Sequence, residues 1–418
     1  MRIAHFIHRY PPALGGAEVY FARLSRWLAG RGHQVVVHTT NALDLEAFWS
    51  PLARRLPARR EQQAGVVIER HPLRHLPGQR YVMKALSLLP WPRWQAFTLS
   101  CNPVTPSLWS RCGAAAPCDV VHASAFPYAW PLLCAQRLAR RQGVPFLLTP
   151  FLHLGDPTQT SDRTRAAYLA PALRQLLTQA DGIFVQTRLE ETAVLELGIE
   201  PVRVILQGLG VDPAECTGGD RARGRDRWLI GPDRPCIGHL ANLSEEKGSV
   251  DLIRAAVPLW QAGQRFHLLL AGPMMPNFRR FWRGLSPAVR RWVMLTGPLP
   301  EEQKPDFYAA LDLFALPSRS DSFGLVLLEA WAAGVPCVGY RAGGVAEVIH
   351  HEEDGLLVPC GDVPALTAAL ADLLSQPERR RQMGTAGRQR VLASCTWQPR
   401  LEIVERAYQT CRPRCGRN

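Results

Sequence analysis

The chain has 418 residues, of which 47% are hydrophobic and 20% are charged. This composition is ordinary for a globular protein and excludes a mainly disordered chain, because disordered chains hold too few apolar residues to form a core. The 49 basic and 36 acidic residues give a formal net charge of +13, and only three of the basic residues are lysines: Lys84, Lys247 and Lys304. From the length we expect two or three domains.

The first part of the chain has the pattern of a strand–helix–strand unit. Residues 2–8 are a short apolar run, residues 11–16 have turn chemistry, residues 17–29 place apolar side chains on one helical stripe, and residues 34–39 are a second apolar run. A unit of this kind predicts a parallel, doubly wound sheet. Further short strands are predicted at 66–68, 119–122, 146–149 and 183–186.

The composition changes at residues 207–235, which are rich in glycine, proline and alternating charge and therefore predict an exposed linker. The strand–helix alternation then restarts. It predicts a helix at 250–262 and strands at 236–240, 266–271, 293–296, 313–316, 337–340 and 355–358. We therefore predict an α/β protein with two Rossmann-like parallel-sheet domains, at 1–206 and 236–395, that face a central cleft.

The 11 cysteines are scattered from Cys101 to Cys415 and form no C-x-x-C pair. This pattern favours neither a disulfide framework nor a zinc site. Bridges between Cys112 and Cys118 or between Cys411 and Cys415 stay open as alternatives to unpaired thiols in a reducing cytosol. The first apolar run is too short for a signal peptide, and no apolar run reaches the ~20 residues of a membrane span. We therefore expect a cytoplasmic protein.

The most informative segment is 316–339, LPSRSDSFGLVLLEAWAAGVPCVG. A polar turn leads through Asp321 into a predicted helix that ends at Gly334. Asp321 and Glu329 are eight residues apart, about 80° of rotation on a helix, so we expect both to reach one site. Asp321 also suits a helix N-cap. Glu329 lies in an apolar run, where a buried carboxylate needs either the hydroxyls of a ligand or an ion pair within the fold.

This segment resembles the E-x7-E signature of retaining nucleotide-sugar glycosyltransferases of family 4, the group 1 glycosyltransferases, which have the two-lobed GT-B fold. Other segments follow in the order of that family: 268–273, 295–297, 311–318, 343–347, 354–359, 383–388 and 395–397. The resemblance covers nearly all of the second domain and, more loosely, the first. It implies that a helix within 396–418 crosses back to the first domain, which would bind the acceptor.

The resemblance also implies the chemistry. A hexosyl group would move from a UDP-sugar or GDP-sugar, without a further cofactor, to a glycan or lipid-linked acceptor in cell-envelope polysaccharide or glycolipid synthesis. Glu329 would bind the ribose of the donor, and Asp321, one methylene shorter than the usual glutamate, would contact the transferred sugar. The free N–H groups at the start of the helix favour phosphate. Four further donor-binding residues lie there: Ser322, Phe323, Gly324 and Leu325.

The segment NLSEEKG carries a second predicted group of donor-binding residues. In the family this loop has an arginine and a lysine that neutralise the donor diphosphate. Lys247 and Gly248 fit that pattern, whereas Asn242 replaces the arginine. A lysine is a suitable point charge for a phosphate. The alternative is a solvated loop lysine beside Glu245 and Glu246.

Two weaker signals lie in the first half of the chain. Gly15 and Gly16 would let backbone amides approach a phosphate or would simply form a tight turn, and the resemblance implies contact with the donor phosphate across the cleft. His153, in TPFLHLGD, is either structural or, by the resemblance, close to the transferred sugar. The predicted catalytic set is His153, Asp321 and Lys247. No D-x-D motif is present where a donor would need one, so we expect Lys247 and helix termini to replace a metal.

Residues 1–100 hold 14 basic and five acidic residues, and residues 81–94 interleave aromatic, aliphatic and basic side chains. This pattern suits peripheral contact with an anionic membrane, at the inner face of the plasma membrane, or a loop packed on its own domain. We expect no nucleic acid partner, because no zinc finger, basic recognition helix or RNP-like signature is present. The alternatives are a non-catalytic GT-B-fold binding protein and a sugar phosphorylase, although no lysine lies in a context that suggests a pyridoxal phosphate Schiff base.

Overall fold

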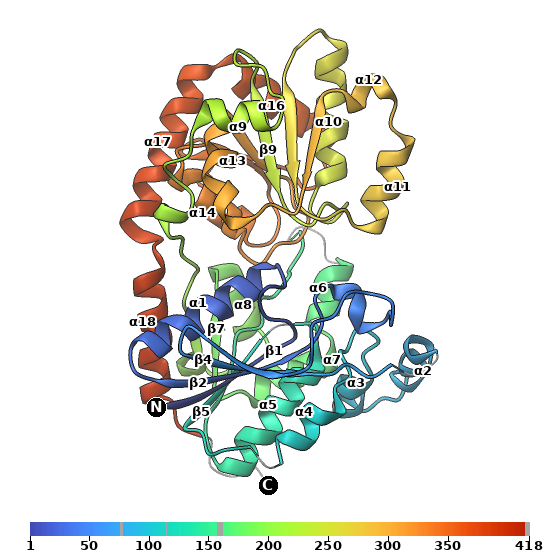
Figure 1. Ribbon diagram of the computed structural model, residues 1–418, viewed down its shortest axis with the longest axis vertical. Helices are drawn as coiled ribbons and strands as arrows, with labels where there is room; N and C mark the ends of the chain where they lie inside the picture. Colours follow the sequence, from blue (N-terminus) through green and yellow to red (C-terminus); the bar gives the residue numbers. More distant parts are fainter. Residues whose placement is uncertain (76–77, 114, 125, 157–161, 414–418) are drawn as a thin grey trace. The chain divides into compact units, whose positions relative to one another are not determined.

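The computed structural model describes residues 1–75, 78–113, 115–124, 126–156 and 162–413. The chain divides into two compact units, each an α/β structure (Figure 1). Unit 1 comprises residues 1–152, 165–207 and 401–418, and unit 2 comprises residues 153–164 and 208–400.

Unit 1 is built on an eight-stranded sheet in the order β3-β4-β2-β1-β5-β6-β7-β8. The sheet is parallel except for the edge strand β3, which pairs antiparallel with β4. Its strands are β1 (Arg2–Ile7), β2 (Gln34–Thr40), β3 (Arg60–Gln63), β4 (Val66–His71), β5 (Val120–Ala123), β6 (Phe146–Leu148), β7 (Gly182–Val185) and β8 (Val204–Leu206). The strands β3 and β8 were not predicted, because β3 is a polar edge strand and β8 is only three residues long.

Helices surround this sheet, with α1 packed on β1 and β2, and α5 packed on β1 and β5. The helices of this part of the chain are α1 (Gly16–Gly30), α2 (Gln79–Leu86), α3 (Pro92–Thr98), α4 (Pro106–Arg111), α5 (Ala129–Gln142), α6 (Arg163–Tyr168), α7 (Pro171–Gln179) and α8 (Arg188–Leu195). Short 3₁₀ helices are η1 (Leu45–Phe48) and η2 (Pro201–Arg203).

The last helix, α18 (Trp397–Thr410), completes the core of unit 1 from Leu401 onward. The hydroxyl of Tyr408 lies 2.9 Å from Nε2 of His5 and 2.6 Å from Nδ1 of His122, and all three side chains are buried. These hydrogen bonds satisfy polar groups that would be costly to bury alone. α18 is therefore packed into the core of the same unit as β1, the first strand of the chain.

Unit 2 has a six-stranded parallel sheet in the order β11-β10-β9-β12-β13-β14. Its strands are β9 (Cys236–Leu240), β10 (His267–Ala271), β11 (Val293–Gly297), β12 (Leu313–Leu316), β13 (Cys337–Tyr340) and β14 (Gly355–Val358). Its helices are η3 (Pro213–Glu215), α9 (Arg221–Arg227), α10 (Ser249–Gln261), α11 (Pro276–Gly284), α12 (Pro287–Arg290), η4 (Glu301–Gln303), α13 (Lys304–Ala310), α14 (Leu325–Ala332), α15 (Val345–Val348), α16 (Val363–Ser375) and α17 (Pro377–Ser394). The buried strands are rich in valine and leucine, as expected for a parallel sheet covered on both faces.

The second half of the segment predicted to be an exposed linker instead forms α9, which packs against α13. Arg223 Nη2 lies 2.6 Å from Asp306 Oδ1, and a Cβ atom at Gly224 would lie only 2.5 Å from the carbonyl oxygen of Asp306. Arg225 is buried and donates to Asp312 Oδ2 at 2.7 Å. The charges that suggest a solvated segment in the sequence thus form ion pairs within unit 2.

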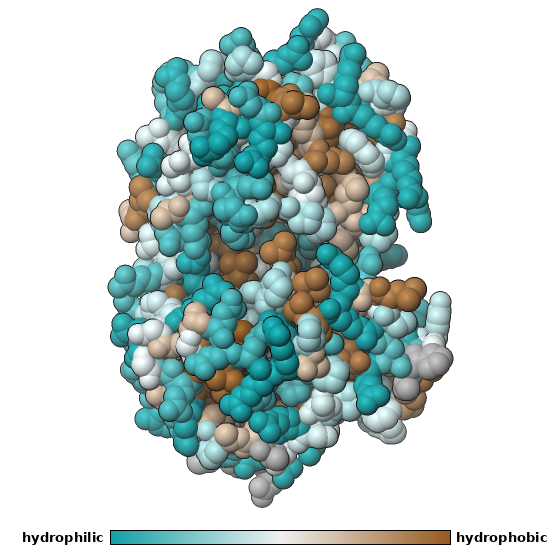
Figure 2. Space-filling view, viewed as in Figure 1, coloured by the Kyte–Doolittle hydropathy of each residue, from teal (hydrophilic) through white to brown (hydrophobic). Residues whose placement is uncertain are grey.

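The described cysteines, including Cys112 and Cys118, are free thiols, so the first of the two possible bridges is not formed. The second would involve Cys415, which lies outside the described residues. Among the residues that the structure describes, no helix has both the length and the apolar character needed to cross a membrane. On the face drawn in Figure 2, hydrophilic side chains predominate and apolar ones form small groups.

Candidate functional site

The strand order of unit 2 defines where a ligand would bind. β10 and β11 lie on one side of β9, whereas β12, β13 and β14 lie on the other. In open parallel sheets, ligands bind beyond the carboxyl ends of the strands, at the point where the order reverses. That point lies between β9 and β12. The loops that follow these strands, residues 241–248 and 317–324, carry most of the predicted donor-binding residues.

Lys247, in the first of these loops, forms an ion pair with Asp321 in the second. Lys247 Nζ lies 2.7 Å from Asp321 Oδ2, and the two side chains are 23% and 18% exposed. Because water screens this pair only in part, the attraction is stronger than in a surface salt bridge. Glu246 instead accepts a hydrogen bond from Asn277 Nδ2 at 3.1 Å. Lys247 is therefore not the solvated loop lysine that the sequence left open.

Asp321 has a second task in the same turn. Its Oδ1 accepts hydrogen bonds from the backbone N–H groups of Gly324 at 3.1 Å and Phe323 at 3.4 Å. Burial would raise the pKa of Asp321, but the charge of Lys247 beside it holds the pKa below its ordinary value. Asp321 is therefore an ionised carboxylate at neutral pH, and it both stabilises the turn before α14 and holds Lys247 in place.

His153 lies within electrostatic range of this ion pair. Burial, helped by the charge of Lys247, lowers the pKa of His153 to about 4, although Asp321 and the backbone of Ser320 oppose the shift. The ring is consequently neutral at pH 7. The structure thus brings together His153, Lys247 and Asp321, the three residues predicted to be catalytic.

Two glycines allow the loops of the site to touch. Gly248 has φ +76°, and a Cβ atom there would lie 1.9 Å from the carbonyl oxygen of Pro317. Gly344 follows β13 and donates its N–H to the carbonyl of Asp321 at 2.7 Å, and a Cβ atom there would lie 2.2 Å from the carbonyl oxygen of Ser322. Any larger residue would separate the loops, so these glycines fix the position of Asp321 through the backbone.

Glu329 lies in α14 and has protein partners for both carboxylate oxygens. Lys304 Nζ lies 3.0 Å from Oε1, and the hydroxyl of Tyr308 donates to Oε2 at 2.7 Å. The side chain of Glu329 is only 9% exposed. Donor ribose hydroxyls would have to use its remaining lone pairs or compete with these two partners. The ribose-binding role of Glu329 therefore stays a prediction.

The expectation that Asp321 and Glu329 project from one helix is wrong. α14 begins only at Leu325, and Gly324 before it has φ +85°, a left-handed conformation that interrupts the helical path. The rotation of about 80° therefore does not apply to this pair. Instead, each carboxylate is paired with a different lysine.

Lys304 is the residue that the sequence analysis missed. Two of the three lysines in the chain, Lys247 and Lys304, pair with the two carboxylates of the motif, Asp321 and Glu329. The scarcity of lysine was the signal that could have identified Lys304.

The remaining residues predicted to bind the donor lie nearby in sequence or in unit 1. The half-buried Asn242 follows β9, and among the described residues its side-chain amide makes no hydrogen bond. In unit 1, Gly15 precedes α1, and a Cβ atom there would lie 2.2 Å from Glu18 Oε2, whereas Gly16 has open space around it. Gly15 thus makes room for a carboxylate.

That carboxylate belongs to a buried network which the sequence analysis did not find. Glu18 is 2% exposed and lies 2.5 Å from Arg9 Nη2 and 3.3 Å from His8 Nε2. Burial would raise the pKa of Glu18, but the charges of Arg9 and His8 lower it to about 2. A phosphate beside Gly15 and Gly16 would have to tolerate this negative charge, so phosphate binding by these glycines stays a prediction.

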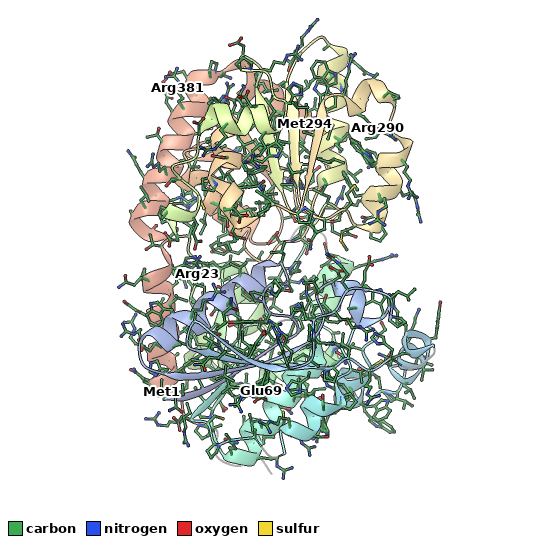
Figure 3. The ribbon with its side chains drawn as sticks, in the orientation of Figure 1. Met1, Arg23, Glu69, Arg290, Met294 and Arg381 are labelled. Carbon is green, nitrogen blue, oxygen red and sulfur yellow. The ribbon has the colours of Figure 1, made fainter. Side chains whose placement is uncertain are left out.

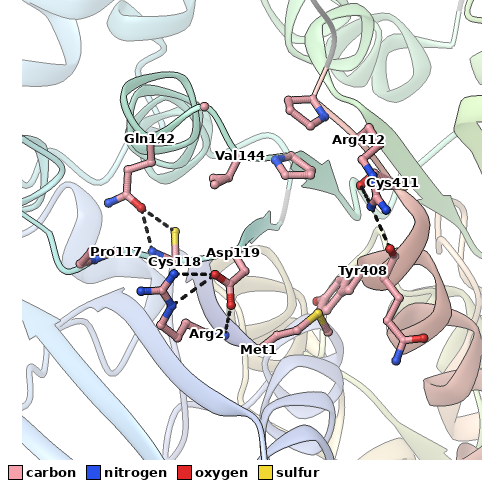
Figure 4. Close-up of a pocket in the computed structure, with 14 residues that line it drawn as sticks. Met1, Arg2, Pro117, Cys118, Asp119, Gln142, Val144, Tyr408, Cys411 and Arg412 are labelled. Carbon is pink, nitrogen blue, oxygen red and sulfur yellow. Dashed lines mark hydrogen bonds and ion pairs between the residues drawn. The ribbon is translucent and has the colours of Figure 1, made fainter.

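A cavity of about 720 Å³ lies elsewhere in unit 1 (Figure 4). Its lining includes Arg2, Asp119 and Val144, which lie at the amino ends of β1, β5 and β6. Arg2 and Asp119 are paired there at 2.6 Å. Because ligands of parallel sheets bind at the opposite, carboxyl ends of the strands, this cavity is not the donor site.

Two family models match the chain. The model described as glycosyl transferase 4-like domain matches residues 15–210, and the model described as glycosyl transferases group 1 matches residues 220–390. The chain therefore belongs to the group 1 glycosyltransferases. This result confirms the predicted family and an enzyme of the glycosyltransferase class, and it favours neither the binding protein nor the phosphorylase that the sequence left open.

Among similar proteins, the 2-deoxystreptamine N-acetyl-D-glucosaminyltransferase of Streptomyces fradiae is 29% identical over 97% of this chain and 92% of its own length. A GDP-mannose-dependent alpha-(1-6)-phosphatidylinositol monomannoside mannosyltransferase of Mycolicibacterium smegmatis is 36% identical over 43% of this chain and 49% of its own length.

Two solved structures share the fold. Sucrose-phosphate synthase from Thermosynechococcus elongatus has a TM-score of 0.73 and 22% identity, with 98% of each chain covered. Anabaena HepE in complex with UDP-glucose has a TM-score of 0.72 and 18% identity, covering 98% of this chain and 100% of that one. Together with the two parallel-sheet units, these likenesses confirm the predicted GT-B fold.

Proposed function

We propose that this glycosyltransferase is a retaining, metal-independent hexosyltransferase that uses a UDP-sugar or GDP-sugar in the cytoplasm. One observation carries the proposal. Lys247, Asp321 and the neutral His153 meet at the carboxyl ends of β9 and β12, where the strand order reverses. A cation, a carboxylate and a neutral imidazole are the groups needed to bind a diphosphate and the hydroxyls of a sugar.

Each group has a distinct task in this proposal. Negative charge grows on the leaving diphosphate as its bond to the sugar breaks, and the ammonium of Lys247 stabilises that charge. Lys247 has three N–H donors, so it can contact a phosphate and still hold Asp321. Asp321 then accepts hydrogen bonds from sugar hydroxyls, and His153 contributes a hydrogen bond without adding a second positive charge.

The nucleotide is the first point to test. HepE has been solved with UDP-glucose, and the mycobacterial relative is named as GDP-mannose-dependent, so both bases have support. Thermal unfolding of the purified protein with UDP, GDP and ADP should show stabilisation by one nucleotide, since a ligand at 100 times its Kd adds about 2.7 kcal/mol. No stabilisation by either UDP or GDP would refute the donor proposal.

Transfer itself should then be followed with the selected donor. NMR of the product should show the anomeric configuration of the donor, and the rate should not change after treatment with a chelator. Asp321→Asn and Lys247→Met should reduce transfer, whereas Arg265→Met, at an exposed arginine just before β10, should not. An inverted product would refute the retaining part, and loss of activity with the chelator in protein that stays folded would refute the metal-independent part.

For the acceptor we propose a glycan or a lipid-linked sugar, as part of cell-envelope polysaccharide or glycolipid synthesis. Other relatives are named for inositol 3-phosphate and for 2-deoxystreptamine, which add a soluble cyclitol as a second candidate acceptor. The 2-deoxystreptamine relative supports this candidate because it matches 97% of this chain. A competition assay with a phosphatidylinositol monomannoside, inositol 3-phosphate and 2-deoxystreptamine separates the two acceptor classes.

A surface of unit 1 supports the lipid-linked alternative. Tyr81 and Leu88 are each 81% exposed and Trp91 is 62% exposed, on and between α2 and α3, and the exposed Lys84 and Arg93 lie among them. Aromatic and apolar side chains next to basic ones suit an anionic membrane surface. We propose that this surface, called the α2–α3 surface, makes peripheral contact with such a membrane.

Sedimentation with vesicles tests this membrane contact. Binding should require anionic lipid and should weaken as salt rises, because each basic residue near the surface contributes about 1 kcal/mol that salt screens. Leu88→Glu should reduce binding. Val202→Glu, at an apolar residue of unit 1 that is 86% exposed outside the α2–α3 surface, should have little effect. If the protein stays in the supernatant with anionic vesicles at low salt, a soluble acceptor is favoured.

A further inference from the structure

Two neighbouring strands of unit 1 bring three potential metal ligands together. None of the three belongs to the proposed donor site or to the α2–α3 surface. β2 and β4 pair in parallel with His38 opposite Glu69. His71 follows Glu69 by two residues on β4, and side chains two residues apart on a strand point to the same face. The rings of His38 and His71 have their centres 5.9 Å apart. Glu69, which is opposite His38 and two residues before His71, is labelled in Figure 3.

The ligand atoms of this group are close and shielded. His38, Glu69 and His71 are 5%, 9% and 8% exposed. One ligand atom from each lies within 4.8 Å of the other two. Tetrahedral Zn²⁺ with bonds of 2.0–2.1 Å spaces its ligands by about 3.4 Å, so modest side-chain rotations would close the site.

His71 provides a second, independent observation. Its Nε2 is buried and, among the described residues, has no hydrogen-bond partner, whereas its Nδ1 lies 3.5 Å from Ser107 Oγ. Histidines that bind metals typically use one ring nitrogen for the ion and the other for a hydrogen bond that orients the ring. The contact between His38 and Glu69 accounts for the burial of those two side chains without a ligand, but it gives no partner to the buried Nε2 of His71.

The charges around the group are compatible with a cation on one side of Glu69. Oε1 of Glu69 faces Arg111 at 3.2 Å and Arg60 at 3.7 Å, whereas Oε2 faces Nδ1 of His38 at 3.4 Å. The two arginine side chains are 45% and 66% exposed, so water screens their repulsion of an ion. A cavity of about 490 Å³, lined in part by His38, Glu69 and Arg111, gives an ion a path to the group.

From these observations we infer that His38, Glu69 and His71 form a site for a divalent transition-metal ion. Two imidazoles and one carboxylate, with a fourth position left for water, are a ligand set that Zn²⁺ uses in proteins. The ion would join β2 to β4 near their carboxyl ends and stabilise unit 1. It would have no part in neutralising the donor diphosphate, so the metal-independent transfer proposed above can fail or hold separately.

Cobalt titration of the untagged, chelator-treated full chain tests the inference. Co²⁺ should bind with one equivalent and give the visible absorption of a tetrahedral site, and Zn²⁺ should displace it. His71→Ala and Glu69→Gln should each weaken Co²⁺ binding at least tenfold. His350→Ala, at an exposed histidine of unit 2, is the control and should leave the titration unchanged.

The inference is overturned if no such absorption develops, or if folded His71→Ala protein binds Co²⁺ as tightly as the wild type. Circular dichroism shows whether each variant folds. Should a substitution unfold the protein, hydrogen exchange on the wild type decides. Zn²⁺ should slow exchange in peptides that contain residues 34–40 and 66–71, and unchanged exchange there would also overturn the inference.

Discussion

The pairing of Glu329 with Lys304 leads to a prediction about which partner the fold depends on more. The side chains of Lys304 and Glu329 are 11% and 9% exposed, and their charged atoms are 3.0 Å apart. Burial would lower the pKa of Lys304, but the charges of Glu329 and Glu301 raise it well above its ordinary value. Removing one partner of a buried pair typically costs 3–5 kcal/mol, because the other charge is left without compensation.

Lys304→Met keeps the length of the side chain and removes the charge, so Glu329 keeps only the hydroxyl of Tyr308. We expect unit 2 to lose about 3–4 kcal/mol. Glu329→Gln should cost only about 1–2 kcal/mol, because the amide can still accept from Lys304 and donate to Tyr308, and two charge-assisted bonds become weaker. Lys304 also keeps Glu301 at 2.9 Å.

Urea denaturation, together with hydrogen exchange of the peptide that contains α14, should measure these losses. Lys84→Met, the same substitution at an exposed lysine, is the control and should change stability by less than about 0.5 kcal/mol. The reasoning is refuted if Lys304→Met costs less than about 1 kcal/mol, or if Glu329→Gln costs as much as Lys304→Met. Calorimetry of folded Glu329→Gln with the nucleotide then tests the ribose-binding role, which unchanged affinity would exclude.

Three further predictions concern the other contacts of the site. Lys247→Met should reduce turnover more than donor affinity, because diphosphate charge grows during reaction; steady-state kinetics and calorimetry compare the two, and equal losses would argue against this role. Gly248→Ala should destabilise unit 2 by more than 1 kcal/mol in urea, since its Cβ would lie 1.9 Å from the carbonyl oxygen of Pro317, and an unchanged midpoint would show that the loops can move apart. His153 has a pKa lowered to about 4 by burial, so the unfolded state takes up its proton first as pH falls. The contribution of His153 to the free energy of unfolding should be complete above pH 6.5 and should fall by about 3 kcal/mol towards pH 4. In urea denaturation at several pH values, His153→Asn should make the free energy of unfolding depend less on pH.

The sequence predicted the strands of unit 2 well because each is a short, continuous apolar run between turn residues. β9, β12, β13 and β14 occupy the residues predicted for them. The same local pattern did not predict β3, because this edge strand is polar and is held in the sheet by its hydrogen-bonded pairing with β4. It also failed for α9, whose arginines are matched by Asp306 and Asp312 from distant parts of the chain.

The site divides in the same way. By itself, the sequence predicted the family and the fold class, which the comparisons confirm, because both depend on residue types at fixed local spacings. It also predicted a catalytic role for His153, Lys247 and Asp321, which stays a prediction. Only the tertiary structure decided that Asp321 precedes the helix and pairs with Lys247, and that Glu329 is held by Lys304. The partner of a buried charge depends on which loops the strand order brings side by side. The local spacing of residues along the chain does not determine that order.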